Sequence, residues 1–315
     1  MKREIKIAVI VSSRYRKYSE ICLEIFNKYF NYNDDEINVT ADFFVHTHEK
    51  TCEFNYDKTQ WLQNSITSQN IDDINNILKP KKLVIETNYD CISSKLKSYV
   101  ENKYVFWCAD EKYSNDFQRL YQYHSFEEGV KLMTQYEIEN NIKYDFAFKM
   151  RPDLFIKLSS QNGYIFKFPF LWERGYSDLT HKDAQWAKKF RINNTVFVHD
   201  LSVACGYPKM CDTTFYSSSA GIRKFTENFT VQIVKNLINV YTDFSHDEPM
   251  RDTLMTPESI IVNHVVEKNI NLVSIPDGLH STVCIRPNYI HDSDFVKMCE
   301  LYNQFAQGEK FRLTC

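Results

Sequence analysis

The segment of this chain with the most specific chemistry is Arg151-Pro152-Asp153, which follows an apolar strand expected over residues 145–150. A guanidinium can hold a phosphate through two parallel hydrogen bonds. A carboxylate two residues further on suits a metal ion or a sugar hydroxyl. Open α/β sheets bind ligands at the carboxyl ends of their strands. The segment therefore predicts a site for a sugar nucleotide, and the alternative interpretation is a buried structural ion pair.

The elements before this strand decide where it lies. Apolar residues three and four positions apart predict a helix over residues 118–140: Leu120, Tyr123, Phe126, Val130, Met133 and Tyr136. Apolar runs predict three earlier strands, over residues 5–11, 42–45 and 82–86. Shorter helices are expected between these strands, one capped by Ser19 and one over residues 71–78. This alternation predicts an α/β fold with a mostly parallel, Rossmann-like sheet that is flanked by helices.

The second half of the chain is less regular. Five apolar residues predict one helix after serines 217–219: Ile222, Phe225, Phe229, Ile233 and Leu237. Thr256-Pro257-Glu258 is a strong helix start, with proline in the first turn and an acid at the positive end of the helix dipole. Residues 206–216 are interpreted as turn-rich. Shorter elements are expected over residues 163–170, 194–198 and 295–305. No repeat or linker divides the chain, so we expect a single domain, residues 1–315.

The composition excludes several classes of protein. The 38 Lys and Arg nearly balance the 41 Asp and Glu, so no electrostatic field favours nucleic acid as a partner. No apolar run reaches the ~18 residues that are typical of a membrane span, so we expect no transmembrane segment. The nine cysteines form no C-x-x-C pair, and the first residues lack a long apolar region. These features predict reduced thiols and a cytoplasmic location.

A second candidate site is the loop of residues 12–17, which follows the first predicted strand. Its backbone N–H groups and basic side chains suit a nucleotide phosphate, with Ser12 and Arg14 as the best candidates. The chain has neither G-x-G-x-x-G nor G-K-[ST], which disfavours a dinucleotide dehydrogenase or a P-loop enzyme. A solvated basic loop is the alternative, and a phosphosulfate donor of a sulfotransferase is a further one.

The sequence His46-Thr47-His48-Glu49 ends the second predicted strand. Alternate residues of a strand point the same way, so His46 and His48 lie on one face. Two imidazoles can bind Zn²⁺ only with a third ligand from elsewhere, for which His199-Asp200 is available. We favour instead an edge of the nucleotide pocket, formed by His46 and Thr47, and ordinary polar residues are the alternative. Residues 108–111, Cys-Ala-Asp-Glu, are a weaker candidate for metal binding.

Five motifs, in order along the chain, resemble those of a known group of enzymes. They are residues 7–14, Asp42 to Thr47, Tyr144 to Asp153, Asp212 to Ser218, and Pro257-Glu258. This pattern is similar to that of the GT-A-type glycosyltransferases of lipopolysaccharide and capsule synthesis and of large DNA viruses. The resemblance covers residues 5–275, and the Arg-x-Asp segment carries most of it. It implies a GT-A-like fold in which about residues 1–155 bind the nucleotide sugar and about residues 156–315 bind the acceptor.

The resemblance implies transfer of a sugar from a nucleotide diphosphate donor, with UDP-sugars favoured, to a hydroxyl of a glycan acceptor. Such enzymes commonly use Mn²⁺ or Mg²⁺, held by an Asp-x-Asp motif. In this chain Arg151 replaces the first acid, so Asp153 is the remaining metal ligand and metal dependence is in doubt. An inverting transfer needs a carboxylate base, for which Asp212 and Glu258 are the candidates. The alternative function is a non-catalytic carbohydrate- or nucleotide-binding module.

Overall fold

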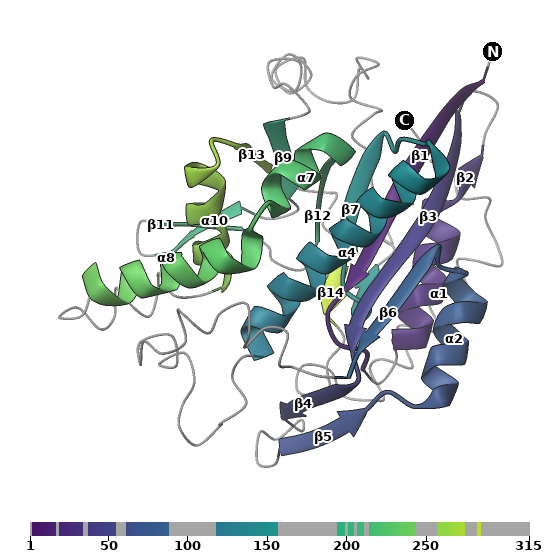
Figure 1. Cartoon of the computed structure of the whole chain (residues 1–315), viewed down its shortest axis with the longest axis horizontal. Helices are drawn as coiled ribbons and strands as arrows, with labels where there is room; N and C mark the ends of the chain where they lie inside the picture. Colours follow the sequence, from purple (N-terminus) through teal and green to yellow (C-terminus); the bar gives the residue numbers. More distant parts are fainter. Residues whose placement is uncertain are drawn as a thin grey trace, which may run out of the picture.

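The protein is described by a computed structural model, shown in Figure 1. The described residues are 2–16, 19–33, 37–54, 61–87, 118–156, 194–198, 201–204, 207–210, 214–243, 257–274 and 282–284. Within them the expected fold class is confirmed: an α/β fold with a mostly parallel sheet flanked by helices. The elements expected over residues 163–170 and 295–305 lie outside the described residues.

The main sheet of the described part has eight strands. Their order is β13 (Asn271–Ser274), β9 (Thr195–Val198), β12 (Phe215–Ser218), β7 (Phe146–Met150), β1 (Arg3–Ser12), β3 (Ile37–His48) and β2 (Tyr32–Asn33), with β6 (Lys82–Glu86) also paired to β3. β1 pairs in parallel with β3 and β7, β3 with β6, and β9 with β13. β12 is antiparallel to both of its neighbours, β7 and β9, and β2 is antiparallel to β3.

The remaining elements are helices and short two-stranded sheets. The helices are α1 (Ser19–Phe30), α2 (Ser68–Leu78), α4 (Gln118–Asn140), α7 (Ser219–Thr226), α8 (Phe229–Asp243) and α10 (Pro257–Glu267). The short antiparallel pairs are β4 (Lys50–Phe54) with β5 (Trp61–Ser65), β8 (Leu154–Ile156) with β14 (Thr282–Cys284), and β10 (Leu201–Ala204) with β11 (Tyr207–Met210). The part of the chain that the structure describes contains no helix long and apolar enough to cross a bilayer.

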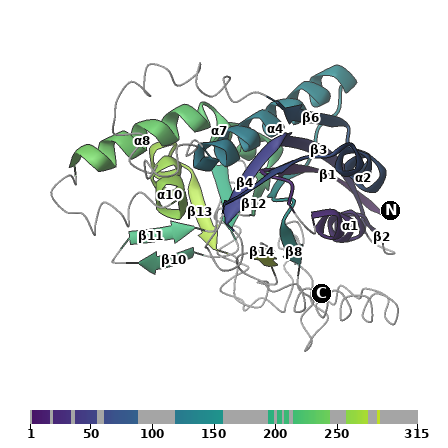
Figure 2. The ribbon, with the colours of Figure 1, turned by 90° about the horizontal axis from the view of Figure 1, so that it is seen from below.

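Helices cover both faces of the sheet. Figure 2 shows α4 and α7 on one face and α1 on the other. α4 crosses directly over β1, where Gly129 allows the close approach: a Cβ at this position would lie 2.6 Å from Cγ2 of Ile10. α4 joins β6 to β7, which both run parallel to β1, so it must run in the opposite direction. Its first turns therefore lie over the carboxyl ends of these strands.

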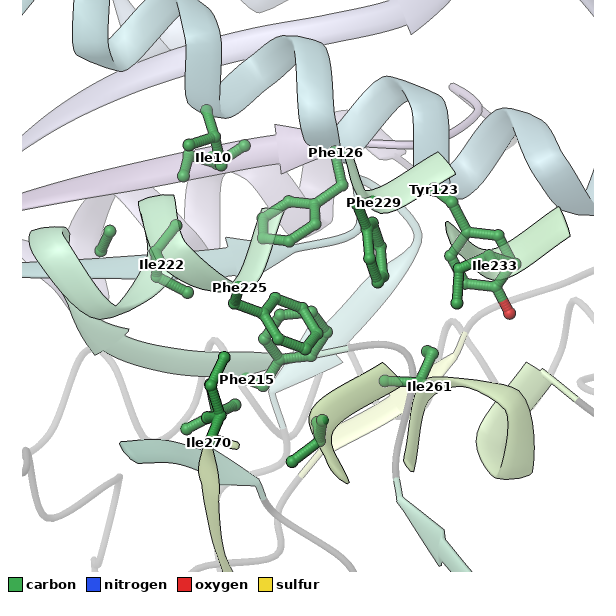
Figure 3. Close-up of a cluster of buried hydrophobic side chains, with 14 of the residues drawn as sticks. Ile10, Tyr123, Phe126, Phe215, Ile222, Phe225, Phe229, Ile233, Ile261 and Ile270 are labelled. Carbon is green, nitrogen blue, oxygen red and sulfur yellow. The ribbon is translucent and has the colours of Figure 1, made fainter. Parts of the chain in front are cut away.

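A hydrophobic cluster lies between the sheet and the helices α4, α7, α8 and α10 (Figure 3). At its centre Phe126, Phe215, Phe225 and Phe229 pack edge to face or tilted, with ring centroids 4.9–6.3 Å apart. Aromatic rings of this size bury much apolar area, and their edge-to-face contacts add specific geometry. The cluster joins the two halves of the sequence into one core, because Phe126 precedes β7 and the other three rings follow β9.

The structure corrects three details of the sequence interpretation. Residues 206–216 are not merely turn-rich, since they contain β11 and the start of β12. The single helix expected after residues 217–219 is two helices, α7 and α8, which are separated at Asn228 with φ 55°. Asparagine tolerates this left-handed conformation, and the apolar spacing continues across the break because both helices pack on the same core. The hairpin of β4 and β5 was not expected.

Candidate functional site

Four parallel strands bring the candidate residues to one edge of the sheet. In the register of β1 with its neighbours, Ser12 lies beside His46 and Val11 lies beside Met150. The chain runs from β1 outward to β3 and β6, then returns to β7 on the other side of β1. Ligands of doubly wound sheets bind where the strand order reverses in this way. The two sequence-predicted loops, after β1 and after β7, lie on either side of this switch point.

Asp153 is enclosed by two arginines at the switch point. Its Oδ1 accepts a hydrogen bond from Arg151 Nε at 2.9 Å, and its Oδ2 accepts one from Arg151 Nη2 at 2.8 Å. Arg16 Nε, from the loop after β1, lies 3.2 Å from the same Oδ2. All three side chains are at least nine-tenths buried. The predicted pair is therefore a buried ion cluster that ties the β1 loop to the β7 loop.

The arginines of this cluster keep their positive charges. Two guanidiniums face one carboxylate, and a guanidinium does not lose its proton in a protein. Both oxygens of Asp153 already accept hydrogen bonds, so the surroundings do not fit a divalent cation. The role of Asp153 as a metal ligand stays a prediction that these contacts do not favour. Arg16 was not singled out from the sequence, although it lies in the predicted loop.

The loop after β1 has an unusual backbone conformation. Ser13 is buried and has φ 111°, which residues other than glycine rarely adopt. Two buried hydrogen bonds hold it: its N–H donates to Ser125 Oγ at 3.1 Å, and its carbonyl accepts from Thr47 Oγ1 at 2.7 Å. Strained residues of this kind persist only where the surroundings enforce them, and they are concentrated at functional sites. Ser12 and Arg14 flank this turn.

The predicted residues His46 and Thr47 shape this loop from the neighbouring strand. Thr47 holds the Ser13 carbonyl directly. The carbonyl of His46 accepts a hydrogen bond from Ser125 Oγ at 2.6 Å, and the Nδ1 atom of His46 lies 3.1 Å from the same oxygen. Ser125 therefore connects α4, β1 and β3 at one point. Burial also raises the pKa of Tyr15, two residues after Ser13, so its buried phenol stays neutral.

A second cluster surrounds Glu86 at the end of β6. Three buried histidines face its carboxylate: His124 Nε2 lies 3.1 Å from Oε1, His46 Nε2 lies 3.8 Å from Oε1, and His48 Nδ1 lies 3.4 Å from Oε2. The rings of His46 and His48 lie on one face of β3, as predicted, with centroids 5.8 Å apart. Glu86 and His124 are the additional partners. His199 and Asp200, which the sequence suggested, lie outside the described residues.

Sequence reasoning missed His124 and Ser125, although a signal was present. Both are buried polar residues in the first two turns of α4. A helix between two parallel strands must begin over their carboxyl ends, where the ligand site is expected. Buried polar residues near the start of such a helix are therefore candidates for a site.

The two candidate bases have different outcomes. Asp212 lies outside the described residues, as do residues 108–111. Glu258 lies in the first turn of α10, which returns to β13 through the short turn 268–270. β13 runs in the same direction as β7, because β12 is antiparallel to β7 and β9. The first turn of α10 therefore points to the same edge of the sheet as Arg151, and β13 lies three strands from β7.

Comparison with known proteins found similarity at the level of structure only. No protein family model matches the chain, and no curated protein sequence matches it. Among solved structures, it is similar to the galactosyltransferase LgtC in complex with donor and acceptor sugar analogues: 9% identity, TM-score 0.33, with 86% of this chain and 73% of that chain covered. It is also similar to mouse xyloside xylosyltransferase 1, apo form: 9% identity, TM-score 0.33, with 96% of this chain and 83% of that chain covered. Both are glycosyltransferases, but similarity at this level shows nothing about what this chain binds.

Proposed function

We propose that the protein is a glycosyltransferase that moves a sugar from a nucleotide diphosphate donor, with UDP favoured, to a hydroxyl of a glycan acceptor. The observation that carries the proposal is the ion cluster of Arg16, Arg151 and Asp153 at the topological switch point. The motif resemblance of residues 5–275 supports the same function. In this proposal about residues 1–155 bind the donor and about residues 156–315 bind the acceptor.

The two guanidiniums of the cluster suit the diphosphate of such a donor. Arg16 and Arg151 keep their positive charges at a largely buried position. Arg14 lies in the same loop and is half-buried. Charge-assisted hydrogen bonds to phosphate are among the strong ones in proteins, because the cation is planar and permanently charged. Ser12 lies at the start of the same loop and is proposed as a further contact to the nucleotide.

The proposed reaction needs little covalent chemistry from the protein. The acceptor oxygen attacks the anomeric carbon, the bond from that carbon to the diphosphate oxygen breaks, and the electron pair leaves with the nucleotide diphosphate. Arg16, Arg151 and Arg14 stabilise the charge that develops on this leaving group, as fixed charges in a dry site do. The acceptor proton passes to a carboxylate, for which Asp212 and Glu258 remain the proposed bases.

Titration calorimetry with UDP tests the donor site. We expect the wild type to bind UDP in the presence of EDTA, because the arginines and not a metal ion hold the diphosphate. Arg151→Gln and Arg14→Gln each remove a charged phosphate contact, so each is expected to weaken binding about tenfold or more. Arg223→Gln is the matched control: it removes an arginine that pairs with Glu137 near the opposite end of α4.

Assays of sugar transfer then separate the possible functions. The transferase is supported if the wild type releases UDP from a UDP-sugar in the presence of a glycan. Arg151→Gln should lose this activity, and Arg223→Gln should keep it. Tight binding of a glycan or nucleotide without turnover of any common donor would show a binding module instead. If the protein binds a phosphosulfate donor that UDP does not displace at any concentration, the result would point to a sulfotransferase. A wild type that binds no nucleotide diphosphate contradicts the proposal.

A further inference from the structure

We propose that His46, Glu86 and His124 form a binding site for a divalent transition-metal ion, with Zn²⁺ as the ion that fits best. The site is distinct from the arginine cluster around Asp153 and does not depend on nucleotide binding. Its three residues come from β3, β6 and α4, so they meet only in the folded chain. Each offers one ligand atom, and these atoms all lie within 4.8 Å of one another.

The distances are close to those of a formed metal site. Ligand atoms that lie about 2.1 Å from a tetrahedral Zn²⁺ are about 3.4 Å apart. His124 Nε2 and His46 Nε2 lie 3.1 and 3.8 Å from Glu86 Oε1, on either side of this value. These two distances differ from that value by a few tenths of an ångström, and all three ligand atoms lie within 4.8 Å of one another. The rings of His46 and His124 are perpendicular, with centroids 5.8 Å apart, so the two imidazoles approach from different directions.

The hydrogen bonds of Ser125 orient His46 for a metal. The Ser125 hydroxyl proton is directed to the carbonyl of His46 at 2.6 Å, so its oxygen can only accept from His46 Nδ1. Neutral His46 then carries its proton on Nδ1, and Nε2 presents a lone pair toward Glu86. Metal-binding histidines characteristically donate from their other ring nitrogen in this way, which sets the tautomer and the direction of the ring.

The other two ligands also have supporting neighbours. Glu128, one turn further along α4, places a carboxylate oxygen 3.8 Å from His124 Nδ1, the nitrogen that faces away from Glu86. His48 Nδ1 lies 3.4 Å from the second oxygen of Glu86. The three histidines are almost fully buried, whereas the side chain of Glu86 is 17% exposed. The ion would therefore enter from the side of Glu86.

The ligand types select the metal. Imidazole suits Zn²⁺ and its neighbours in the first transition row, whereas Mg²⁺ and Ca²⁺ require oxygen ligands. Two histidines and one glutamate fill three positions of a tetrahedral ion and leave one for water or a substrate group, as in catalytic rather than structural zinc sites. Ser125 also holds the turn at Ser13, so the metal site and the β1 loop share one supporting residue.

Calorimetric titration of the full chain with ZnCl₂ tests the proposal directly. The protein should carry no polyhistidine tag and should be treated with EDTA and dialysed first. We expect one Zn²⁺ per chain, and no binding of Mg²⁺ under the same conditions. Co²⁺ should bind at the same position and give the visible absorption of a four-coordinate site, which is lost when Zn²⁺ displaces it.

Variants locate the ion. His124→Ala and the isosteric Glu86→Gln each remove a ligand, so affinity should fall by more than the roughly 10- to 100-fold that loss of an outer partner costs. Ser125→Ala removes such an outer partner and should weaken Zn²⁺ binding within that 10- to 100-fold range. Glu139→Gln is the matched control, because it removes a carboxylate from α4 that pairs with Lys82 at the surface.

Three results would overturn the proposal. They are the absence of Zn²⁺ binding by the wild type, Zn²⁺ affinity that is unchanged in both ligand variants, and Mg²⁺ binding as tight as Zn²⁺ binding. Circular dichroism spectra of each variant show whether it is folded, and Glu86→Gln preserves the size of the side chain where His124→Ala does not. UDP binding is measured separately, so failure of the metal site leaves the proposed glycosyltransferase function open to its own test.

Discussion

Two carboxylates lie at the same edge of the sheet, and different nitrogen-bearing side chains surround them. Asp153, after β7, is enclosed by the guanidiniums of Arg16 and Arg151, whereas Glu86, at the end of β6, faces three imidazoles. A guanidinium keeps its charge and offers planar hydrogen-bond donors, so the arginines of the first cluster suit an anion. A neutral imidazole offers a lone pair, so the second cluster suits a metal ion. The partners of a carboxylate, more than the carboxylate itself, therefore decide which ligand the two positions can hold.

The largest expected difference between the clusters is in stability. Asp153→Ala leaves two buried guanidiniums without their carboxylate, so we expect a loss of about 3–5 kcal/mol in the free energy of unfolding. Glu86→Gln leaves imidazoles that can be neutral, so the expected loss is smaller, about 1–3 kcal/mol. Urea denaturation at neutral pH measures both values. Equal losses would show that the two clusters do not differ in the way described.

His264 is a buried histidine outside both clusters, and it lies inside the apolar core. It lies against the rings of Phe225 and Phe229, and its Nε2–H donates to the carbonyl of Phe225 at 2.6 Å. Burial lowers the pKa of His264 to about 4, and the nearby charge of Lys268 acts in the same direction, while the Phe225 hydrogen bond and Glu127 oppose it. The folded protein therefore keeps this imidazole neutral.

This lowered pKa predicts a dependence of stability on pH. Between about pH 6.5 and pH 4 the unfolded chain binds a proton at His264 that the folded chain does not, so stability falls as the pH is lowered through this range. The loss amounts to about 3 kcal/mol when the window is crossed. Urea denaturation at pH 7 and pH 4.5 measures it, and His264→Gln, which does not titrate, should show a correspondingly weaker dependence. The same dependence in both proteins contradicts the assignment.

The smallest predicted effect concerns α4, the helix that carries His124. Gly129→Ala places a Cβ 2.6 Å from Cγ2 of Ile10, and overpacking of this kind costs about 1–3 kcal/mol, partly offset by the roughly 1 kcal/mol helix preference of alanine. We expect a net loss of about 1–2 kcal/mol and weaker Zn²⁺ binding, because α4 moves His124 away from His46. Calorimetric titration and urea denaturation measure the two effects.

Gln135→Ala, on the exposed side of α4, is the control for this substitution. It should change neither stability nor Zn²⁺ affinity measurably, since surface substitutions away from buried contacts have small effects. A Gly129→Ala protein that is destabilised but binds Zn²⁺ normally would show that the position of α4 does not control the metal ligands. UDP affinity in the same variant tests whether the arginine cluster is unaffected.

The amino-acid sequence alone determined the elements that carry their own local pattern. α4 and β6 have the predicted bounds, β7 begins within one residue of its predicted start, and α10 begins at the predicted proline. The sequence also placed Arg151 and Asp153 just after a buried strand, and His46 and His48 on one face of another. These predictions succeed because side-chain periodicity along a helix or strand depends only on residues a few positions apart.

Only the tertiary structure decided which of these residues meet. β12, a short and fully buried strand without periodicity, lies between β7 and β9, which no local pattern indicated. Arg16 reaches Asp153 because the sheet places β7 beside β1, and His124 reaches Glu86 because α4 runs back across the strands. Strand order and the direction of a crossing helix follow from how buried faces pack together over long distances in the sequence. Which residues come together in each of the two clusters therefore depends on that packing, and the residue types alone do not show it.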